Sequence, residues 1–315
     1  MDKDSLILQA YDRKKELSLN NKEYRKDVLR IFNLLLENDL KNNDLTARAL
    51  IPKNKKIRAA IIAKEKGILS GVEEISFFLR KNSLKVKLFK KDGNFIYSEQ
   101  KIMELHGNAR KIFALERTCL NALQRMSGIS TKTKFLAGKL KSNVNIAGTR
   151  KTILGPLEHK AITVGGGLSH RLGLYDSILI KDNHLGFLDK DLSKDLFFAL
   201  LSAAIKRGKS RFIEIEAAYP SRARLAAGYI DTIRKKTRAK IPFIIMLDNF
   251  SPGVIWKTLK RIKKECLKNI LIEASGGINE KNIKKYCIKG VDVVSMGCLT
   301  NSAKSLDMSM KIIKK

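Results

Sequence analysis

Acidic residues are scarce in this chain. The sequence has 31 Asp and Glu against 63 Lys and Arg, which gives a formal net charge of +32 over 315 residues. An excess of this size suggests nucleic acid as a partner. However, no helix-turn-helix, RNA-recognition or zinc-finger pattern is present, and the cations are spread over several predicted helices. We therefore predict a lysine-rich solvated surface and no specific nucleic acid partner; nonspecific polyanion binding remains the alternative.

Cysteine is also rare, and long apolar runs are absent. The four cysteines, which have neither paired nor CxxC spacing, are Cys119, Cys266, Cys287 and Cys298. This spacing argues against a zinc site and favours free, buried thiols. No apolar run approaches the ~20 residues of a membrane span, and the first thirty residues lack the apolar core of a signal peptide. We therefore expect a cytoplasmic protein with no membrane attachment.

Six short apolar runs stand out in the second half of the chain. They cover residues 144–147, 177–180, 212–215, 243–247, 270–272 and 292–296. Runs spaced by roughly twenty to thirty-five residues, with room for a helix between each pair, are typical of repeated β/α units. The sequence thus predicts an α/β protein with a β/α barrel, and a chain of 315 residues is long enough for a second domain.

Polar residues follow each predicted strand. In strand order they are Arg150 and Lys151, Lys181 and His184, Glu216, Asp248, Ser275 and Gly276, and finally Gly297. In β/α barrels the residues at the carboxyl ends of the strands converge on one site. We therefore expect these side chains to meet.

Several candidate anion-binding residues lie between residues 147 and 184. This segment contains Arg150, Lys151, His170, Arg171, Lys181 and His184. An arginine holds a carboxylate in a fixed plane through two hydrogen bonds, so Arg150 and Arg171, with Arg117 on a predicted helix, could bind a small diacid. The alternatives are an ordinary basic loop, structural histidines and an exposed helix arginine.

Two acidic residues lie on one face of a predicted strand. Glu214 and Glu216 are two positions apart, so their side chains project to the same side. Two carboxylates inside a barrel are costly unless cations or a metal compensate them. Together with Asp248 they could hold Mg²⁺ and the hydroxyls of a sugar phosphate. A structural ion pair of Glu214 with Lys151 or Lys181 is the alternative.

Glycines near the last two strands suggest a phosphate site. Ser275-Gly276-Gly277 precedes a helix expected near residue 279, and Gly297 precedes another expected near residue 302. Glycines permit close backbone approach, and the N–H groups at a helix start attract phosphate.

The first part of the chain predicts a smaller sheet with helices. Apolar periodicity indicates an amphipathic helix over residues 24–40 and a long helix over 109–126. Strands are expected at 59–63, 84–89 and 95–98, a further helix at 72–79, and a hairpin turn at 91–93. This mixture is typical of a sheet with helices on one face.

Several longer stretches resemble one enzyme family, in order along the chain. They are NDLTARALIP at 43–52, KEKGILSGVEE at 64–74, ERTCLNALQRMSGIST at 116–131, AGTRKT at 147–152, GGGLSHRLGLYDSILIKDNH at 165–184, IEIE at 213–216, IMLDNFSP at 245–252, EASGGINEKNI at 273–283 and VDVVSMGCLTNSAKSLDMSMKI at 291–312. On these stretches the chain resembles the decarboxylating quinolinate phosphoribosyltransferases. The resemblance implies an α/β sandwich with an antiparallel sheet at 1–117, completed by a C-terminal helix at 302–315, and an incomplete β/α barrel at 118–301 that carries the active site.

The resemblance also implies a reaction and a role for each matching residue. The family transfers the phosphoribosyl group of 5-phosphoribosyl 1-pyrophosphate to quinolinate and releases pyrophosphate and CO₂, which gives nicotinate mononucleotide for NAD biosynthesis. The implied quinolinate-binding residues are Arg117, Arg150, His170 and Arg171, with Arg117 reaching the neighbouring subunit's site in a homodimer. The implied catalytic and donor-binding residues are Lys151, Lys181, Glu216 and Asp248, with Ser275, Gly276 and Gly297 at the 5-phosphate. Glu216 and Asp248 would bind Mg²⁺ largely through the substrate.

Three departures from the family pattern leave alternatives open. Asn301 stands where the family usually has histidine, the sequence after Thr152 is unusual, and segment 217–240 is longer and more basic than is usual. One alternative is a related phosphoribosyltransferase that acts on another pyridine or acidic acceptor. The other is a basic barrel that binds RNA or another polyanion without catalysis.

Overall fold

The chain forms two compact units. The computed structural model describes residues 2–140, 144–181, 183–184, 205, 210–237, 240–262, 267 and 269–314. The barrel-like unit comprises residues 1–12, 136–151 and 168–298, and the antiparallel unit comprises residues 13–135, 152–167 and 299–315. These units divide the chain differently from the expected boundaries, because residues 1–12 group with the barrel-like part.

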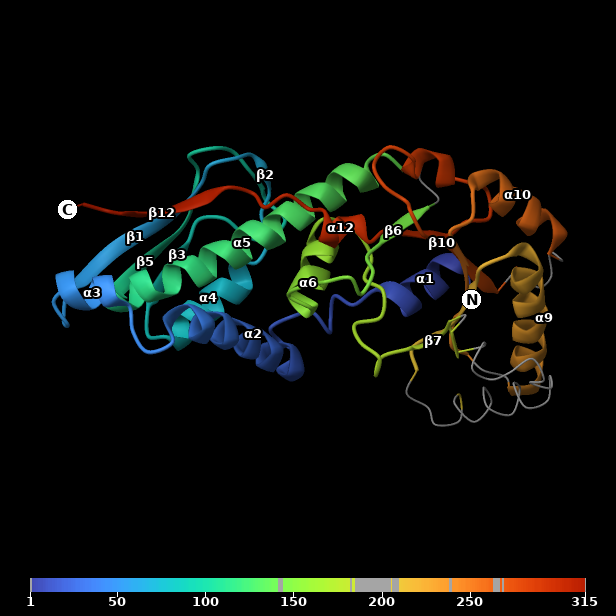
Figure 1. Cartoon of the computed structure of the whole chain (residues 1–315), viewed down its shortest axis with the longest axis horizontal. Coiled ribbons are helices and arrows are strands. Elements are labelled where there is room, and N and C mark those ends of the chain that lie inside the picture. Colours follow the sequence, from blue (N-terminus) through green and yellow to red (C-terminus); the bar gives the residue numbers. More distant parts are fainter. Residues whose placement is uncertain are drawn as a thin grey trace. The chain divides into compact units, whose positions relative to one another are not determined.

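A parallel sheet forms the centre of the barrel-like unit (Figure 1). Its strands lie in the order β6 (Asn145–Ala147), β11 (Val293–Ser295), β10 (Ile270–Ser275), β9 (Phe243–Asp248), β8 (Ile213–Ala217) and β7 (Ile178–Ile180). All six strands predicted from the apolar runs are confirmed. Leu168 forms a further parallel bridge to Ala147 at the β6 edge, and the Arg171 guanidinium donates to the Ser177 carbonyl just before β7 at 3.2 Å. The segment from Leu168 to Ser177 therefore links the two edges of the sheet.

The strand register places the polar residues of neighbouring strands at matching heights. Glu216 is level with Met246, and Met246 is level with Glu273. One step further toward the carboxyl ends, Asp248 is level with Ser275. Because alternate residues of a strand point to the same face, Glu214, Glu216, Asp248, Glu273 and Ser275 project to one side of the sheet.

Helices follow several of these strands. In the described residues they are α9 (Pro220–Thr237), α10 (Pro252–Arg261), the 3₁₀ helix η1 (Ile283–Tyr286) and the single turn α12 (Cys298–Asn301). Two expected helix starts are wrong. After Ser275 the first helical turn is η1, which begins at Ile283 and not near Asn279. The reason is an intervening turn, in which the Asn279 N–H donates to the Asn282 side chain and the Asn282 N–H donates to the Asn279 carbonyl. The helix after Gly297 begins at Cys298 rather than near Ser302. The connection between β7 and β8 and the side chain of Cys266 lie largely or wholly outside the described residues.

An N-terminal helix covers the amino end of the parallel strands. Helix α1 (Lys3–Tyr11) is capped by Asp2 and packs its apolar side chains into a core cluster. The cluster consists of Leu6, Ile7, Ala10, Tyr11, Ala147, Phe212, Ile244, Leu271 and Val293. The Lys3 ammonium pairs with Asp292 at 2.8 Å, immediately before β11. Residues 3–11 thus contribute part of the barrel core.

The antiparallel unit has a four-stranded sheet. Its order is β12 (Met308–Ile312), β1 (Lys56–Ala63), β5 (Lys101–Asn108) and β3 (Lys85–Leu88), and a separate pair joins β2 (Gly67–Ile68) to β4 (Phe95–Ile96). The expected C-terminal helix at 302–315 is wrong, because residues 308–312 form strand β12 along β1. Strand β5 was not expected. The expected hairpin at 91–93 is also wrong, since β3 pairs with β5 and β4 with β2; Asp92 instead accepts a hydrogen bond from the Val72 N–H at the start of a helix.

Helices pack beside this sheet. They are α2 (Lys22–Leu40), α3 (Leu45–Leu50), α4 (Val72–Lys81), the long α5 (Ala109–Ala137), which continues past the end of this unit, and α6 (Pro156–Val164). The predicted helices at 24–40, 72–79 and 109–126 are confirmed. Phe32 of α2 stacks on Phe78 of α4 with ring centroids 4.9 Å apart. None of the described helices has both the length and the apolar composition that a membrane crossing needs.

Candidate active site

The predicted site residues of the barrel-like unit lie at the carboxyl edge of its sheet. Because all six strands are parallel, the residues that end them lie along one edge. Arg150 and Lys151 follow β6, and Lys181 follows β7; all three side chains are exposed. Glu216, Asp248 and Ser275 end or nearly end β8, β9 and β10 and are half-buried. The structure thus places these six residues at one end of one sheet.

Two predicted arginines lie near each other and near a buried acid. Burial lowers the pKa of Arg171, the charge of Arg150 lowers it further, and Glu214 and Asp176 oppose this effect. Arg171 is 6% exposed, and its Nε–H has no hydrogen-bond partner among the described residues. Close approach of two guanidinium groups is unfavourable unless an anion lies between them, so this pair is suited to bind an anionic group.

Glu214 is buried inside the unit and interacts with these arginines through Arg171. Burial raises the pKa of Glu214 to about 8, against the lowering effect of Arg171; the charge of Glu216 adds to the rise and Lys181 opposes it. Five of the side chains singled out in the sequence therefore influence one another electrostatically: Arg150, Arg171, Lys181, Glu214 and Glu216. Perturbed groups of this kind are typical of functional sites.

A buried polar layer lies beneath these residues. The His170 Nε2 shares a hydrogen bond with Glu214 Oε2 at 2.8 Å and lies 3.7 Å from Glu273 Oε2. The Tyr11 hydroxyl of α1 donates to the same Glu273 oxygen at 2.5 Å. Burial, followed by the charge of Glu214, raises the pKa of Glu273 to about 7. His170 is therefore a buried member of a hydrogen-bonded network. Glu214, for which an ion pair with Lys151 or Lys181 was the alternative, shares a hydrogen bond with His170.

The glycine of the expected phosphate loop is required by its surroundings. Gly276 has φ +88, and a Cβ at this position would collide with the Asn249 side chain and backbone nitrogen. The Asn249 amide donates to Asp248 Oδ2 at 2.7 Å, so the loops after β9 and β10 are in contact next to a candidate metal ligand. Gly297 lies between β11 and the single turn α12.

Arg117, Asn301, His184 and the cysteines lie on other elements or act locally. Arg117 is exposed on α5 within the antiparallel unit, and Asn301, also in that unit, accepts a hydrogen bond from the Ser302 hydroxyl at 2.7 Å. His184 accepts a hydrogen bond from the Lys181 backbone N–H at 3.0 Å, which gives it a local capping role. The cysteines Cys119, Cys287 and Cys298 are free thiols.

The expected metal ligands do not form a closed site by themselves. Within the described residues, two groups of metal-ligating atoms lie within 4.8 Å of one another: His170 with Glu214 and Glu273, and Glu73 with Glu74 and Asp92. Neither group contains Glu216 or Asp248. Their carboxylates are nevertheless hard oxygen donors at the ends of adjacent strands, which suits Mg²⁺ held mainly by substrate phosphates.

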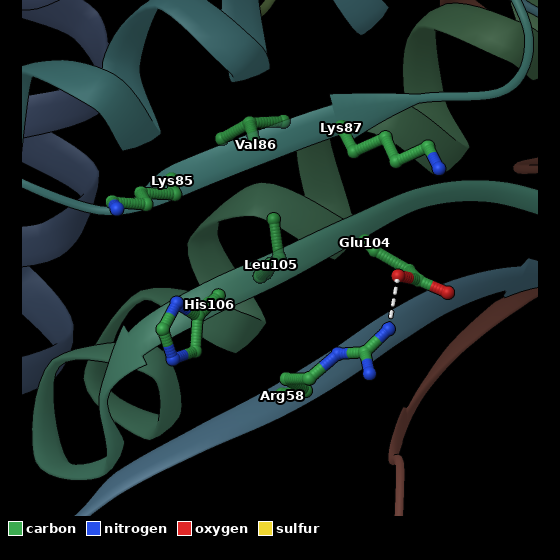
Figure 2. A pocket seen from close by; sticks show the side chains of 7 residues that line it. All are labelled: Arg58, Lys85, Val86, Lys87, Glu104, Leu105 and His106. Carbon is green, nitrogen blue, oxygen red and sulfur yellow. Dashed lines mark hydrogen bonds and ion pairs between the residues drawn. The ribbon is translucent and has the colours of Figure 1, made fainter.

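A hollow on the antiparallel unit is a poor candidate for this chemistry. It has a volume of about 160 Å³ and lies over strands β1, β3 and β5 (Figure 2). Figure 2 shows Arg58 paired with Glu104 across it, at 2.9 Å. Ligand pockets usually measure roughly 300–1,000 Å³, and none of the predicted site residues lines this one.

Two members of the buried layer were not assigned from the sequence. Glu273 lies two residues before Ser275 on the inward face of β10, so the same alternation that selected Glu214 could have selected it. Tyr11 has only a weak signal, the apolar spacing of Leu6, Ile7 and Ala10 in a helix.

Comparison with known proteins identifies the family. Residues 44–127 match the N-terminal domain of quinolinate phosphoribosyl transferase, and residues 129–311 match its C-terminal domain. The chain belongs to the quinolinate phosphoribosyltransferase family. Similar relatives include a probable nicotinate-nucleotide pyrophosphorylase (carboxylating) of Methanocaldococcus jannaschii, 39% identical over 91% of this chain and 98% of the relative. One of the same name from Bacillus subtilis is 35% identical over 90% of this chain and 92% of the relative.

Solved structures of family members have the same fold. The nicotinate-nucleotide pyrophosphorylase of Francisella tularensis aligns with a TM-score of 0.74 at 28% identity, over 92% of this chain and 97% of that one. The NadC structure of Streptococcus pyogenes aligns with a TM-score of 0.75 at the same identity and coverage. The family's α/β fold, an antiparallel domain and a barrel-like parallel domain, is therefore confirmed for this chain.

Proposed function

We propose that this enzyme transfers the phosphoribosyl group of 5-phosphoribosyl 1-pyrophosphate to quinolinate, with loss of pyrophosphate and CO₂, and so forms nicotinate mononucleotide for NAD biosynthesis. The observation that carries this proposal is the placement of Arg150, Lys181, Glu216 and Asp248 at one edge of the parallel sheet, with the buried Arg171 and Glu214 near enough to interact with several of them. Membership of the family over both domains supports the same reaction.

The cationic end of the site binds quinolinate in this proposal. The ligand has two carboxylates, and Arg150 and Arg171 offer two planar guanidinium groups for them. The Nε–H of Arg171, which has no partner among the described residues, can donate a hydrogen bond to a carboxylate. His170 supports this end from the buried layer, and Arg117 of the neighbouring subunit completes it in a homodimer.

The acidic end binds the phosphoribosyl donor. Lys151 and Lys181 lie between the diacid and the pyrophosphate, while Glu216 and Asp248 bind the ribose hydroxyls. Ser275, Gly276 and Gly297 bind the 5-phosphate, because their backbone N–H groups can approach an anion closely. Glu216 and Asp248 would hold Mg²⁺ together with the substrate oxygens, and the ion would neutralise charge on the departing pyrophosphate.

Catalysis follows from this arrangement of charges. As pyrophosphate leaves, positive charge develops at the ribose C1, and the carboxylate of Glu216 stabilises it. The arginines orient the quinolinate ring so that its nitrogen attacks C1, which lowers the entropic part of the barrier. The ring nitrogen of the adduct is cationic, so it stabilises the electron pair left on the adjacent carbon when the carboxylate departs as CO₂, and that carbon then takes a proton from solvent water to give nicotinate mononucleotide. The lysines hold the departing pyrophosphate.

The assembly and the compartment are part of the proposal. A homodimer would supply Arg117 across the interface, and loss of activity on dilution below the dimer dissociation constant would support it. We propose a cytoplasmic location, because the three described cysteines are free thiols, as is usual in a reducing compartment.

A product assay tests the proposed function. The purified chain is incubated with quinolinate, 5-phosphoribosyl 1-pyrophosphate and Mg²⁺, and nicotinate mononucleotide and CO₂ are measured. We expect turnover with quinolinate and none with nicotinate. Turnover of another pyridine acid would favour a related phosphoribosyltransferase. Salt-sensitive RNA binding without turnover, unaffected in a variant that combines Glu216→Gln with Asp248→Asn, would favour the noncatalytic alternative.

A further inference from the structure

Helix α1 lies outside both stretches of the chain that match the family domains, which begin at residue 44. It is nevertheless tightly bound to the barrel-like unit. Arg211, directly before β8, donates to the carbonyl oxygens of Gln9 at 2.9 Å and Asp12 at 2.8 Å, and the Ser169 N–H donates to the Tyr11 carbonyl. The helix is thus fixed at both of its ends, through Lys3 and through Asp12.

Tyr11 is the residue of α1 that reaches the polar layer. Its side chain is fully buried, and its ring stacks on Phe212 at 5.7 Å and meets the His170 ring edge-on at 5.8 Å. Its hydroxyl donates to Glu273 at 2.5 Å, and the same oxygen of Glu273 lies 3.7 Å from His170. One tyrosine therefore touches the imidazole ring directly and also holds the carboxylate beside it.

These contacts hold His170 in place and determine the charge next to it. The aromatic contacts restrict its ring orientation, and an ionised Glu273 places a negative charge 3.7 Å from its Nε2. The Tyr11 hydrogen bond lowers the pKa of Glu273, against the rise caused by burial, so it favours the ionised form. Without the hydroxyl, Glu273 would become protonated at a higher pH and its charge beside His170 would be lost.

We propose that Tyr11 is a positioning residue for quinolinate binding: through Glu273 and through ring contact, it holds His170 in place and keeps a negative charge beside it. This inference rests on the proposed function, in which His170 helps to bind the diacid. It also gives the N-terminal helix a part in substrate recognition.

The antiparallel unit supplies a matched control. The Tyr24 hydroxyl of α2 donates to the buried Glu74 at 2.9 Å, and both side chains are almost fully buried. Tyr24→Phe therefore removes the same kind of hydrogen bond as Tyr11→Phe, but in a part of the chain that holds none of His170, Glu214 or Glu273. A purely structural role for Tyr11 predicts the same result for both variants.

The test compares the full-length wild type, Tyr11→Phe and Tyr24→Phe in Mg²⁺-containing assays with quinolinate and 5-phosphoribosyl 1-pyrophosphate. We expect Tyr11→Phe to raise the KM for quinolinate about tenfold, as for the loss of one charge-assisted hydrogen bond, and to leave the KM for the phosphoribosyl donor unchanged. The acid limb of its kcat/KM profile for quinolinate should move to higher pH. Both variants should lower the melting temperature by similar amounts. Tyr24→Phe should change neither the KM for quinolinate nor the pH profile of kcat/KM.

A second variant, Glu273→Gln, tests the same inference if Tyr11→Phe does not fold. Glu273→Gln can still accept the Tyr11 hydrogen bond but removes the negative charge, so we expect it to raise the KM for quinolinate too. A wild-type KM and pH profile in Tyr11→Phe, or in Glu273→Gln, would overturn the inference, as would equal kinetic effects of Tyr11→Phe and Tyr24→Phe. Absence of turnover in the wild type would instead refute the proposed function.

Discussion

Arg125 in the antiparallel unit and Arg171 in the barrel-like unit each lie beside a buried glutamate, but their remaining donors differ. Arg125 donates from Nε to Glu158 at 2.9 Å and from its terminal nitrogens to the carbonyl oxygens of Thr300 and Ala303, at 2.5 and 3.2 Å. Arg171 donates to the single carbonyl of Ser177 at 3.2 Å. Its Nε–H has no partner among the residues that the structure describes.

This difference distinguishes a folding contact from a binding contact. A guanidinium whose three nitrogens all donate inside the fold, as in Arg125, stabilises that fold and has little to offer a ligand. A buried guanidinium with an unused donor costs stability unless a ligand accepts the hydrogen bond. The buried acids and the close-packed glycines of the two units can be compared in the same way: those of the antiparallel unit serve the fold, and those of the barrel-like unit also serve the proposed site.

The largest effects should come from replacing each of these two arginines by methionine in separate variants. Arg171→Met should raise the KM for quinolinate by roughly 100-fold, because a charged hydrogen bond contributes about 3 kcal/mol and 1.4 kcal/mol corresponds to a factor of ten. Arg125→Met should leave kinetics at permissive temperature near wild type but lower the free energy of unfolding by roughly 3–5 kcal/mol, since Glu158 would remain buried and unpaired. Steady-state kinetics and urea unfolding measure both. If Arg171→Met lowered the free energy of unfolding but left the KM for quinolinate unchanged, the distinction between a folding arginine and a binding arginine would be wrong.

Two glycines give a second, smaller comparison. A Cβ at Gly276 would collide with Asn249, and one at Gly128 of α5 would collide with the Lys304 carbonyl oxygen. We expect each alanine substitution to lower the free energy of unfolding by roughly 1–3 kcal/mol, from strain or overpacking. Only Gly276→Ala should also raise the KM for the phosphoribosyl donor, because its loop holds the 5-phosphate in the proposed site.

Gly277→Ala is the control for the phosphate loop. Gly277 also has a positive φ, of +62, but apart from its chain neighbours no heavy atom of the described residues lies within 4 Å of a Cβ built there. Backbone strain alone would therefore act on both glycines, whereas the collision acts only at Gly276. Equal KM values in Gly276→Ala and Gly277→Ala would show that close contact with Asn249 has no part in donor binding.

The sequence predicted the parallel strands better than it predicted the rest, for physical reasons. Buried parallel strands are continuous apolar runs bounded by polar residues, and strands such as β9 and β10 have this pattern. Strand β12 has a mixed pattern, and its pairing with β1 depends on residues about 250 positions away along the chain. The C-terminal helix was expected only from the family resemblance, and no local pattern at residues 308–312 indicates the long-range pairing that replaces it.

The candidate site likewise has residues that a local pattern predicts and residues that depend on long-range packing. Strand ends located Arg150, Lys181, Glu216 and Asp248, because the edge of a parallel sheet brings such positions together. The depth of His170 and its link to Tyr11 were not predictable in this way. They depend on how a helix more than 150 residues distant in sequence packs into the amino end of the barrel.

The smallest expected effect concerns pH and the buried acids of the antiparallel unit. Burial, followed by the charge of Asp92, raises the pKa of Glu74 to about 7, and burial also raises the pKa of Asp92 to about 6. The folded state therefore binds more protons than the unfolded state between about pH 4 and 7. As a result, the free energy of unfolding falls as the pH rises through this window and levels off above it.

Glu74→Gln isolates this contribution. The amide imitates the protonated acid and can still accept the Tyr24 hydrogen bond, so the variant should lose less stability than the wild type between pH 5 and pH 8, by on the order of 1 kcal/mol. Melting temperatures measured across that range test this, and kcat/KM should stay at the wild-type value because Glu74 has no part in the proposed site. In contrast, Glu214→Gln replaces an acid of the barrel-like layer and should alter the pH profile of catalysis. If Glu74→Gln changed that profile too, the buried acids of the two units would not be separable into structural and functional groups.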